Sequence, residues 1–142
     1  MYRSVPSQGP IIVLFQSALS HARSVLQGFI NGFRGTLICD GYSAYNKIPN
    51  LTSANCWAHV RRYWLKANSK NGQIGVKYCD ELYRLEREFK QLSPSKRRKR
   101  RQKQSKPIVE EFLKWIGESP FFGNNALGKA AEYTLNLADG LC

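Results

Sequence analysis

The spacing of hydrophobic positions changes after about residue 57. Before it, residues 11–15 (IIVLF) and 36–39 (TLIC) form short apolar runs, which predict two buried strands. Between them, residues 20–33 place apolar side chains at helical spacing behind Ser20, a residue type that favours the N-cap. The order strand, helix, strand is typical of an α/β sheet whose second strand runs parallel to the first. A buried strand so near Met1 also predicts that earlier strands of the sheet precede this chain.

The second part of the chain has a helical pattern. We expect a short helix at 43–47, a weak strand at 54–57, and then helices at 58–68, 76–92, 107–116 and 126–141. Gly72 and Gly75 predict a turn between the first two of these later helices, and Pro107 suits the start of the third. The sequence therefore predicts an α/β protein with a mostly helical C-terminal half.

The charge of the chain indicates a polyanionic partner. Lys and Arg number 22 against 10 Asp and Glu, so the formal charge is +12, which favours nucleic acid. Residues 93–106 hold eight cations and no acid, and without them the charge falls from +12 to +4. These cations are Lys96, Arg97, Arg98, Lys99, Arg100, Arg101, Lys103 and Lys106. Contact with DNA phosphates is one interpretation of this basic segment; a merely solvated loop or helix extension, or a nuclear-localisation signal, is the alternative.

Cysteine usage and hydropathy indicate an intracellular protein. The four cysteines lie far apart with no CxxC pair, which predicts reduced cytosolic thiols. The longest apolar stretch, residues 11–15, is far shorter than the roughly 20 residues that span a bilayer. We therefore expect a cytoplasmic protein with no membrane partner.

Asp40 is the clearest candidate for chemistry. It directly follows the predicted strand 36–39 and precedes Gly41, and catalytic groups of open α/β sheets gather at the carboxyl ends of strands. One carboxylate holds Mg²⁺ poorly, because the ion prefers octahedral oxygen coordination, so a partner acid is needed. The alternative is that Asp40 only begins a turn or caps the short helix after it.

Cys56 and His59 lie three residues apart at the start of a predicted helix, and Arg61 and Arg62 follow them. A structural zinc site needs four ligands, and the only other histidine is His21, so we do not expect zinc here. Two interpretations remain. Either Cys56 is buried and His59 makes an ordinary hydrogen bond, or His59 and the two arginines face a phosphate backbone.

Two blocks of the sequence, CDGYSAYN at 39–46 and CWAHVRR at 56–62, resemble the DDE-type transposases of the bacterial insertion-sequence-66 family. The resemblance covers nearly the whole chain, because YRS, GFRGTLIC, LYRLERE, SKPIVEEFLKWI and LGKAAEYTLN also occur in the family's order. It implies an RNase H-like fold in which three acids bind one or two Mg²⁺ or Mn²⁺ ions, and DNA strands are cut or joined there. Asp40 matches the second acid, which makes it a catalytic residue and a metal ligand by resemblance.

The resemblance places the first acid upstream of Met1 and the last acid, a glutamate, downstream of Cys142. The closing LADGLC departs from the family's continuation, which predicts a frameshift or a truncated gene. We therefore expect residues 1–66 to be a partial RNase H-like α/β core without its first strands. Residues 67–142 would be a helical insertion region that carries the basic segment 93–106.

Such a fragment is expected to be inactive alone, because a catalytic set acts as a unit, and to bind no metal tightly. Its expected partners are DNA and other transposase subunits in a bacterial cytoplasm, with no small-molecule substrate. The expected DNA-binding residues are His59, Arg61, Arg62, Lys96, Arg97, Arg98, Lys99, Arg100, Arg101 and Lys103. A non-catalytic basic DNA-binding module and a remnant of a mobile element without function are the alternatives.

Overall fold

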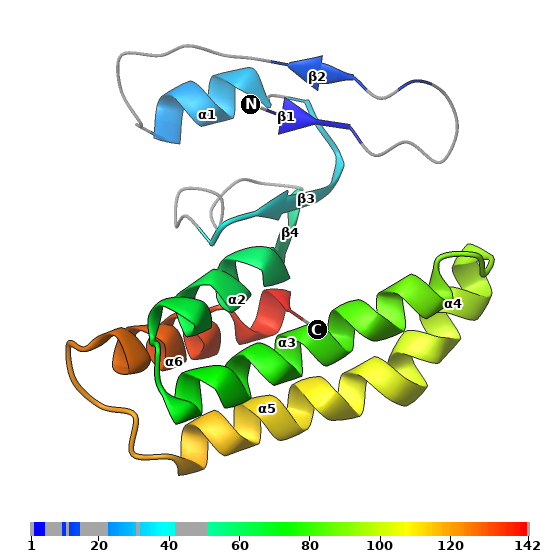
Figure 1. Ribbon diagram of the computed structural model, residues 1–142. Coiled ribbons are helices and arrows are strands. Elements are labelled where there is room, and N and C mark those ends of the chain that lie inside the picture. The colour runs from blue at the N-terminus through cyan, green and yellow to red at the C-terminus, as the bar shows by residue number, and fades with distance from the viewer. Residues whose placement is uncertain are drawn as a thin grey trace.

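The computed structural model describes residues 2–4, 10, 12–14, 23–30, 32–41 and 51–141. In chain order the elements are β1 (Tyr2–Arg3), β2 (Val13–Leu14), α1 (Arg23–Phe29), β3 (Gly35–Cys39), β4 (Leu51–Asn55), α2 (Trp57–Lys66), α3 (Lys70–Phe89), α4 (Pro94–Arg100), the π-helical turn η2 (Arg101–Ser105), α5 (Lys106–Glu118), α6 (Ala126–Asn136) and the 3-10 turn η3 (Ala138–Gly140). Figure 1 shows the helices from α2 onward as one cluster, with β3 and β4 between it and the earliest elements. None of the described helices is long and apolar enough to cross a membrane.

The described strands form two separate two-stranded sheets. β1 pairs antiparallel with β2, and β3 pairs parallel with β4, with Cys39 opposite Asn55. The prediction that the 36–39 strand runs parallel to the 11–15 strand in one sheet is therefore wrong for the residues described. Apolar spacing indicates that a strand forms, but it does not select the partner strand, because pairing depends on contacts distant in sequence.

These strands are also more exposed than their apolar residues predict. Ile12, Val13 and Leu14 are 54%, 44% and 50% exposed, and Ile38 of β3 is 64% exposed. Within β3 only Cys39 is buried. Two strands are too few to bury both faces of a sheet, so the prediction of strands buried on both faces is wrong for the described parts of β2 and β3.

The α/β class with a helical majority is confirmed, while several boundaries differ from the prediction. Strand β4 covers 51–55 rather than 54–57, because Trp57 already begins α2. Ser20 and the helix predicted at 43–47 lie outside the described residues. The RNase H-like fold and the division after residue 66 stay predictions; α2, which precedes that division, packs against α3 and α6.

The core of the helical cluster is built around the side chain of Trp64 in α2, which is fully buried. Its ring centre lies 5.5 Å from that of Phe112, 5.5 Å from that of Trp115 and 6.0 Å from that of Phe121. The indole Nε1 donates a hydrogen bond of 2.9 Å to Thr134 Oγ1 in α6. A buried indole N–H needs such an acceptor. One side chain therefore joins α2 to α5 and α6.

Helix α3 begins earlier than predicted and contains both glycines of the expected turn. Ser69 caps it by accepting a 3.0 Å hydrogen bond from the Gly72 N–H. Gly75 lies against Trp64, and a Cβ atom at Gly75 would be 2.2 Å from the indole. The turn prediction is wrong because Gly75 serves the close approach of two helices and not a change of chain direction.

We expect Gly75→Ala to destabilise the protein by about 1–3 kcal/mol, because overlap with Trp64 outweighs a gain in helix propensity of about 1 kcal/mol. Gly117 in α5 provides the matched control, since a Cβ atom there meets nothing within 4 Å. Gly117→Ala is expected to be neutral or to stabilise by up to about 1 kcal/mol. Urea unfolding measures both changes, and equal stabilities of the two variants would contradict this packing of Trp64 on Gly75.

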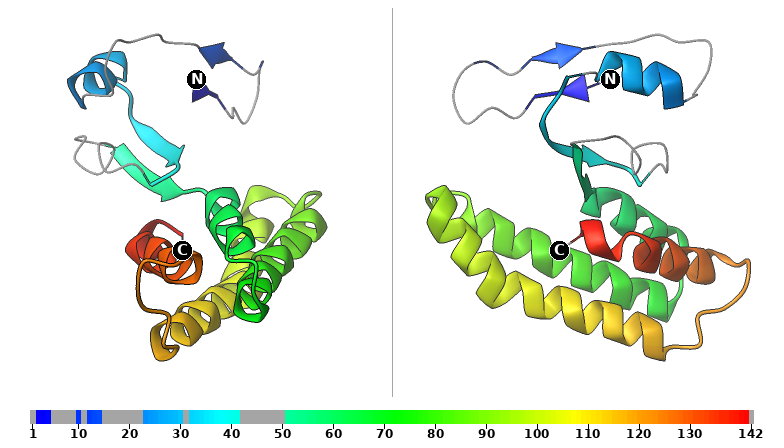
Figure 2. Two further views of the ribbon diagram at one scale, coloured as in Figure 1. Left: turned by 60° about the vertical axis from the view of Figure 1, so that its left-hand side comes forward. Right: turned by 180° about the vertical axis from the view of Figure 1, so that it is seen from behind.

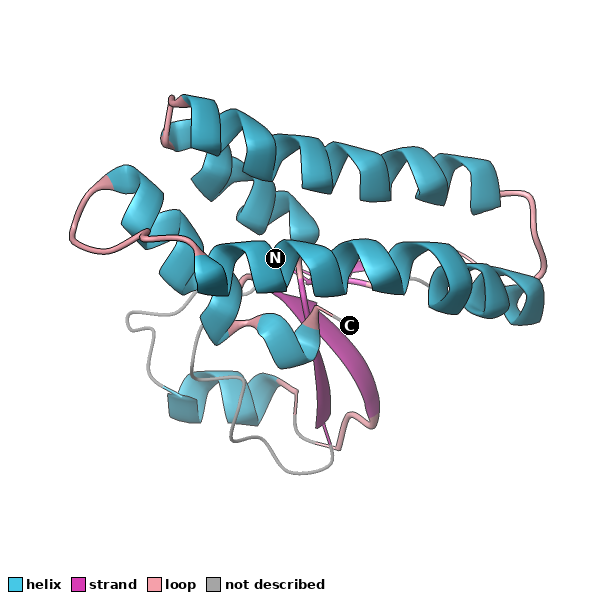
Figure 3. Ribbon diagram, turned by 90° about the horizontal axis from the view of Figure 1, so that it is seen from below, coloured by secondary structure: helices cyan, strands magenta, loops and turns pink. Residues whose placement is uncertain are grey.

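Helix α3 and the continuous helical segment α4–η2–α5 lie side by side as a long hairpin (Figures 1 and 3). The basic segment is therefore helical. Its π-helical turn η2 ends two residues before Pro107. In a regular α-helix, Pro107 would lose a hydrogen bond and collide with the carbonyl four residues earlier. The wider π turn accommodates the proline without ending the helix.

Candidate metal-binding carboxylate and nucleic-acid interface

The carboxyl end of β3 is held on helix α6. Asp40 is exposed and directly follows β3, and its backbone carbonyl accepts a hydrogen bond from the Tyr133 hydroxyl. Gly41 has a φ of 83°, a backbone conformation that favours glycine. A Cβ atom at Gly41 would also lie 2.6 Å from Leu137. The position of Asp40 is thus fixed by its backbone and by the glycine after it.

The end of β4 is tied to the C-terminal turn by side chains that sequence reasoning missed. Asn55 Nδ2 donates a 3.0 Å hydrogen bond to the Leu137 carbonyl, and Trp57 Nε1 donates one of 3.3 Å to the Leu141 carbonyl. The Cys39 thiol lies 3.8 Å from Asn55 Oδ1. Asn55 and Leu137, like Trp57 and Leu141, are more than 80 residues apart in the chain, so no local pattern indicates these two contacts. Figure 2 shows this end of the sheet beside the C-terminal turn.

The pKa of Tyr133 is raised by its buried position beside Asp40. Burial raises the pKa of Tyr133 to about 12, with smaller contributions from Asp40 and Tyr63. The Tyr63 ring stacks on Tyr133 with ring centres 4.1 Å apart. The phenol therefore stays protonated and keeps donating to the Asp40 carbonyl well above neutral pH.

We expect Tyr133→Phe to cost about 1 kcal/mol of stability at neutral pH through the lost hydrogen bond. Because folding raises the pKa of Tyr133 above the value of about 10 in the unfolded chain, its contribution is complete below pH 10 and is lost as the pH rises towards 12. In an ultraviolet titration, this variant should therefore lack the absorbance change of one tyrosine that ionises at the high-pH end of the curve. Loss of a tyrosine that ionises at about pH 10 instead would contradict the buried position of Tyr133 beside Asp40.

The described residues do not form a complete metal site. A carboxylate oxygen is the kind of ligand that Mg²⁺ and Mn²⁺ take, so Asp40 suits these ions in kind. Within the described ranges, however, no group of three or more His, Cys, Asp or Glu side chains is placed to hold a metal ion. The role of Asp40 as a catalytic residue and metal ligand stays a prediction.

Helix α2 does not bring His59, Arg61 and Arg62 to one point, because Arg61 lies about 160° around the helix axis from His59. Arg61 forms two hydrogen bonds, of 2.6 and 3.2 Å, with the carboxylate of Asp80 in α3. The hydrogen bond to Asp80 also raises the pKa of Arg61. Arg62 is exposed, whereas His59 Nδ1 is buried and has no hydrogen-bond partner among the described residues. The ordinary hydrogen bond that we considered for His59 is therefore not made at this atom.

One face of the basic segment is occupied by contacts with α3. Arg97 donates to the carbonyls of Phe89 and Lys90, at 3.3 and 2.8 Å, which satisfies the end of α3. Arg101, one turn later, forms two hydrogen bonds of 2.6 Å with Glu86. This contact lowers the pKa of Glu86. Arg97 and Arg101 thus hold the hairpin together.

The opposite face of the segment is a cationic surface, which we call the basic stripe. It consists of Lys96, Lys99, Arg100 and Lys103. These residues follow the spacing i, i+3, i+4, i+7, which places them on one side of a helix. All four are exposed, and no described residue forms an ion pair with them. Arg98 is also exposed but lies off this line.

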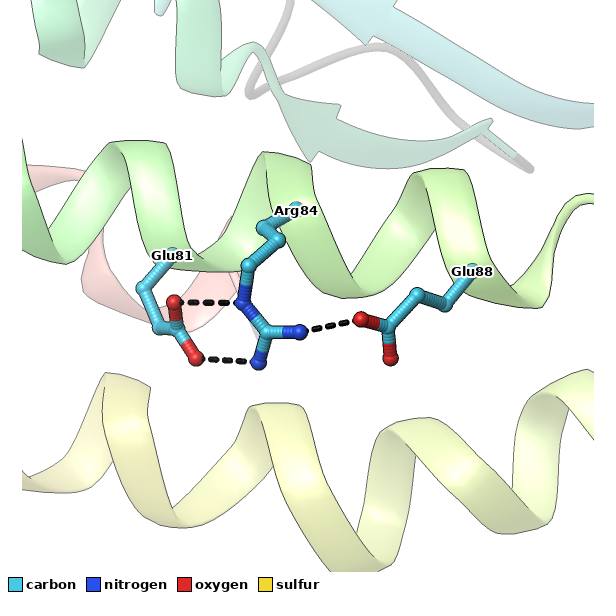
Figure 4. Close-up of polar contacts among 3 residues, drawn as sticks. All are labelled: Glu81, Arg84 and Glu88. Carbon is cyan, nitrogen blue, oxygen red and sulfur yellow. Dashed lines mark hydrogen bonds and ion pairs between the residues drawn. The ribbon is translucent and has the colours of Figure 1, made fainter.

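The charges on α3 are balanced locally, in contrast to the basic stripe. Arg84 forms hydrogen bonds of 2.8 and 2.5 Å with Glu81 and a further one with Glu88, as Figure 4 shows. Both glutamates lie within one helical turn of the arginine. Arg84 therefore adds little net charge to the surface, and the cationic potential is concentrated on α4 and η2.

Comparison with known proteins places this chain among transposases of one family. The family model described as Transposase IS66 family matches residues 1–142. Uncharacterized protein y4jD of Sinorhizobium fredii is 28% identical over 153 residues, covering 96% of this chain and 30% of that protein. Uncharacterized protein y4qI of the same organism is 29% identical over 126 residues, covering 78% of this chain and 23% of that protein. No solved structure matches.

The chain spans less than a third of the length of either relative. The family model nevertheless matches it from the first residue to the last, including the block around Asp40 and the block around His59. This chain therefore belongs to the IS66 family of transposases.

Proposed function

We propose that this chain is the central part of a DNA transposase, with an RNase H-like catalytic core and DNA as its partner. The observation that carries the DNA contact is the basic stripe. Its four cations are exposed and unpaired among the described residues, while Arg97 and Arg101 on the other face are engaged with α3. Seven residues of helix separate the ends of the stripe by about 10 Å, so it can contact more than one phosphate of a DNA strand.

Binding through the stripe is independent of DNA sequence. Lysine and arginine at a phosphate backbone contribute affinity and register, whereas sequence is read at base edges. The stripe therefore holds DNA against the helical cluster without choosing a target. His59, Arg61 and Arg62 are weaker candidates for this contact, because Arg61 is engaged by Asp80 and points to a different side of α2 from His59.

Asp40 is the proposed metal-binding residue. It follows a parallel strand at its carboxyl end, where α/β sheets place their catalytic groups. Its backbone is held on α6 by Tyr133. It supplies one of three carboxylates, and the other two come from outside this chain by the family resemblance. Metal-dependent phosphoryl transfer on DNA is thus proposed for the completed protein, and the chain by itself is proposed to be inactive and to bind Mg²⁺ or Mn²⁺ only weakly.

A titration with Mn²⁺, combined with plasmid cleavage and duplex binding, tests this proposal. We expect salt-sensitive duplex binding, no cleavage, and weak Mn²⁺ affinity. Asp40→Asn is compared with Asp139→Asn, a second exposed aspartate near the C-terminus. Cleavage that disappears only in Asp40→Asn would contradict the incomplete site, because the chain would then assemble an active centre itself. No duplex binding even at low salt would contradict DNA as the partner.

A non-catalytic DNA-binding module is the second candidate. Two observations favour it. The basic stripe is exposed, and the described residues contain no group of three metal-ligating side chains. Supplying the remainder of a family transposase as a separate polypeptide distinguishes the two. Restored strand transfer that depends on Asp40 supports the transposase part, and inhibition of an intact transposase supports the module.

A further inference from the structure

A groove lies between the end of β4, helix α3 and the segment α4–η2–α5, on a different side of the basic segment from the stripe. It has a volume of about 670 Å³, within the range of roughly 300–1,000 Å³ that is usual for ligand sites. Its wall includes Trp57, Tyr83, Arg98, Arg101, Ser105 and Lys106. Neither the proposed metal site nor the basic stripe uses these residues.

The groove contains cations that an anion can reach. Arg98 is exposed and forms no ion pair with a described residue. Lys106 is paired with Glu110 only at 3.8 Å, and both side chains are more than half exposed, so this pair is readily exchanged for another partner. Arg101 is already paired with Glu86. Two cations of the wall are thus available to a phosphate.

The same groove offers aromatic and apolar surface. Trp57 and Tyr83 are both half-buried, and the Trp57 ring is oriented by its hydrogen bond to the Leu141 carbonyl. Burial raises the pKa of Tyr83, so its ring is a neutral phenol at physiological pH. Aromatic faces next to cations suit a nucleotide, because a base stacks on the ring while its phosphate binds the cation.

The π-helical turn η2 contributes a further feature to this wall. Three of its five residues, Arg101, Gln102 and Ser105, line the groove, and π-helical turns occur frequently at functional sites. The hydroxyl oxygen of Ser105 is buried without a hydrogen-bond partner among the described residues. Turning this side chain towards a ligand therefore breaks no existing hydrogen bond.

We propose that this groove binds one unpaired nucleotide of a DNA strand whose duplex part lies on the basic stripe. The proposal rests on the proposed DNA partner and adds a binding site for an extruded or single-stranded nucleotide. The phosphate contacts Arg98 and Lys106, and the base lies against Tyr83. The apolar side chains of Leu82 and Val109 also line the groove and shield the stacked base from water. The stripe supplies the sequence-independent hold on the duplex.

The test compares the binding of the whole chain to a blunt duplex and to the same duplex with a three-nucleotide 3′ overhang. We expect the overhang to raise affinity about tenfold, as stacking of a base on an aromatic side chain does. Arg98→Gln should remove most of this preference while leaving much of the blunt-duplex affinity. Lys99→Gln, the matched control on the basic stripe, should weaken both duplexes equally and keep the preference.

A second readout reports stacking directly. The fluorescent base 2-aminopurine in the overhang should be quenched by the whole chain and not by Tyr83→Leu. If Tyr83→Leu fails to fold, the exposed Arg98 still carries the test. Equal affinities for the blunt and overhung duplexes would overturn the groove proposal alone. Absence of binding to both would overturn the proposed DNA partner as well, and displacement of the overhang by micromolar thymidine monophosphate would show that the occupant is a free nucleotide.

Discussion

Replacing Trp64 by alanine is expected to lower the free energy of unfolding by about 4 kcal/mol, as truncation of a buried tryptophan usually costs 3–5 kcal/mol. The indole is fully buried, contacts three other aromatic rings and forms a hydrogen bond with Thr134. Its removal leaves a cavity where α2, α5 and α6 meet. Domains of this size are typically stable by only about 5–15 kcal/mol, so a large part of the folded stability is at stake.

Urea unfolding followed by far-ultraviolet circular dichroism measures this loss without depending on tryptophan fluorescence. Leu65→Ala is the control, because Leu65 is the next residue of the same helix and is 51% exposed. Its substitution should change stability by no more than about 0.5 kcal/mol. A loss below 1 kcal/mol in Trp64→Ala would show that the helical cluster is not assembled around this side chain.

The second large effect concerns DNA. Replacing the four residues of the basic stripe with glutamine should lower duplex affinity and reduce the slope of log K against log salt by up to about 3.6, since each lost phosphate contact changes it by about 0.9. Fluorescence anisotropy between low and moderate salt concentrations measures both quantities. An unchanged slope would remove the stripe from the DNA interface.

A control with the same loss of charge separates position from net charge. Four exposed lysines outside the basic segment are replaced by glutamine, and they are Lys70, Lys77, Lys90 and Lys129. If the stripe is the interface, this variant should keep nearly the whole salt dependence. If both variants lose it equally, the chain binds DNA through its overall charge and not through one surface.

The sequence indicated the helical second half well, because apolar positions repeat at helical spacing over long stretches. Leu82, Leu85 and Phe89 repeat at helical spacing within the predicted helix 76–92, and all three are buried in α3. The start of that helix was not predictable from local preference. Gly75 weakens a helix by itself, and only the Trp64 ring packed against it explains its place there.

The candidate metal ligand was likewise indicated by local sequence, whereas the contact that holds it was not. Asp40 at the end of a strand follows from a short local pattern, TLIC followed by aspartate and glycine, and β3 confirms the strand. The contact that holds it, from Tyr133, joins residues 93 positions apart. No spacing rule indicates such a contact, because it exists only once α6 has packed beside the sheet.

The sequence by itself determined the family, the helical character of the second half and the concentration of positive charge in residues 93–106. These are properties of local pattern and composition, which each segment carries wherever it lies. Only the tertiary structure decided which cations of that segment are available, because Arg97 and Arg101 meet acceptors on α3 and the stripe does not. It also decided that β3 pairs with β4, since hydrogen bonding between strands and the burial of their faces depend on partners that are distant in the chain.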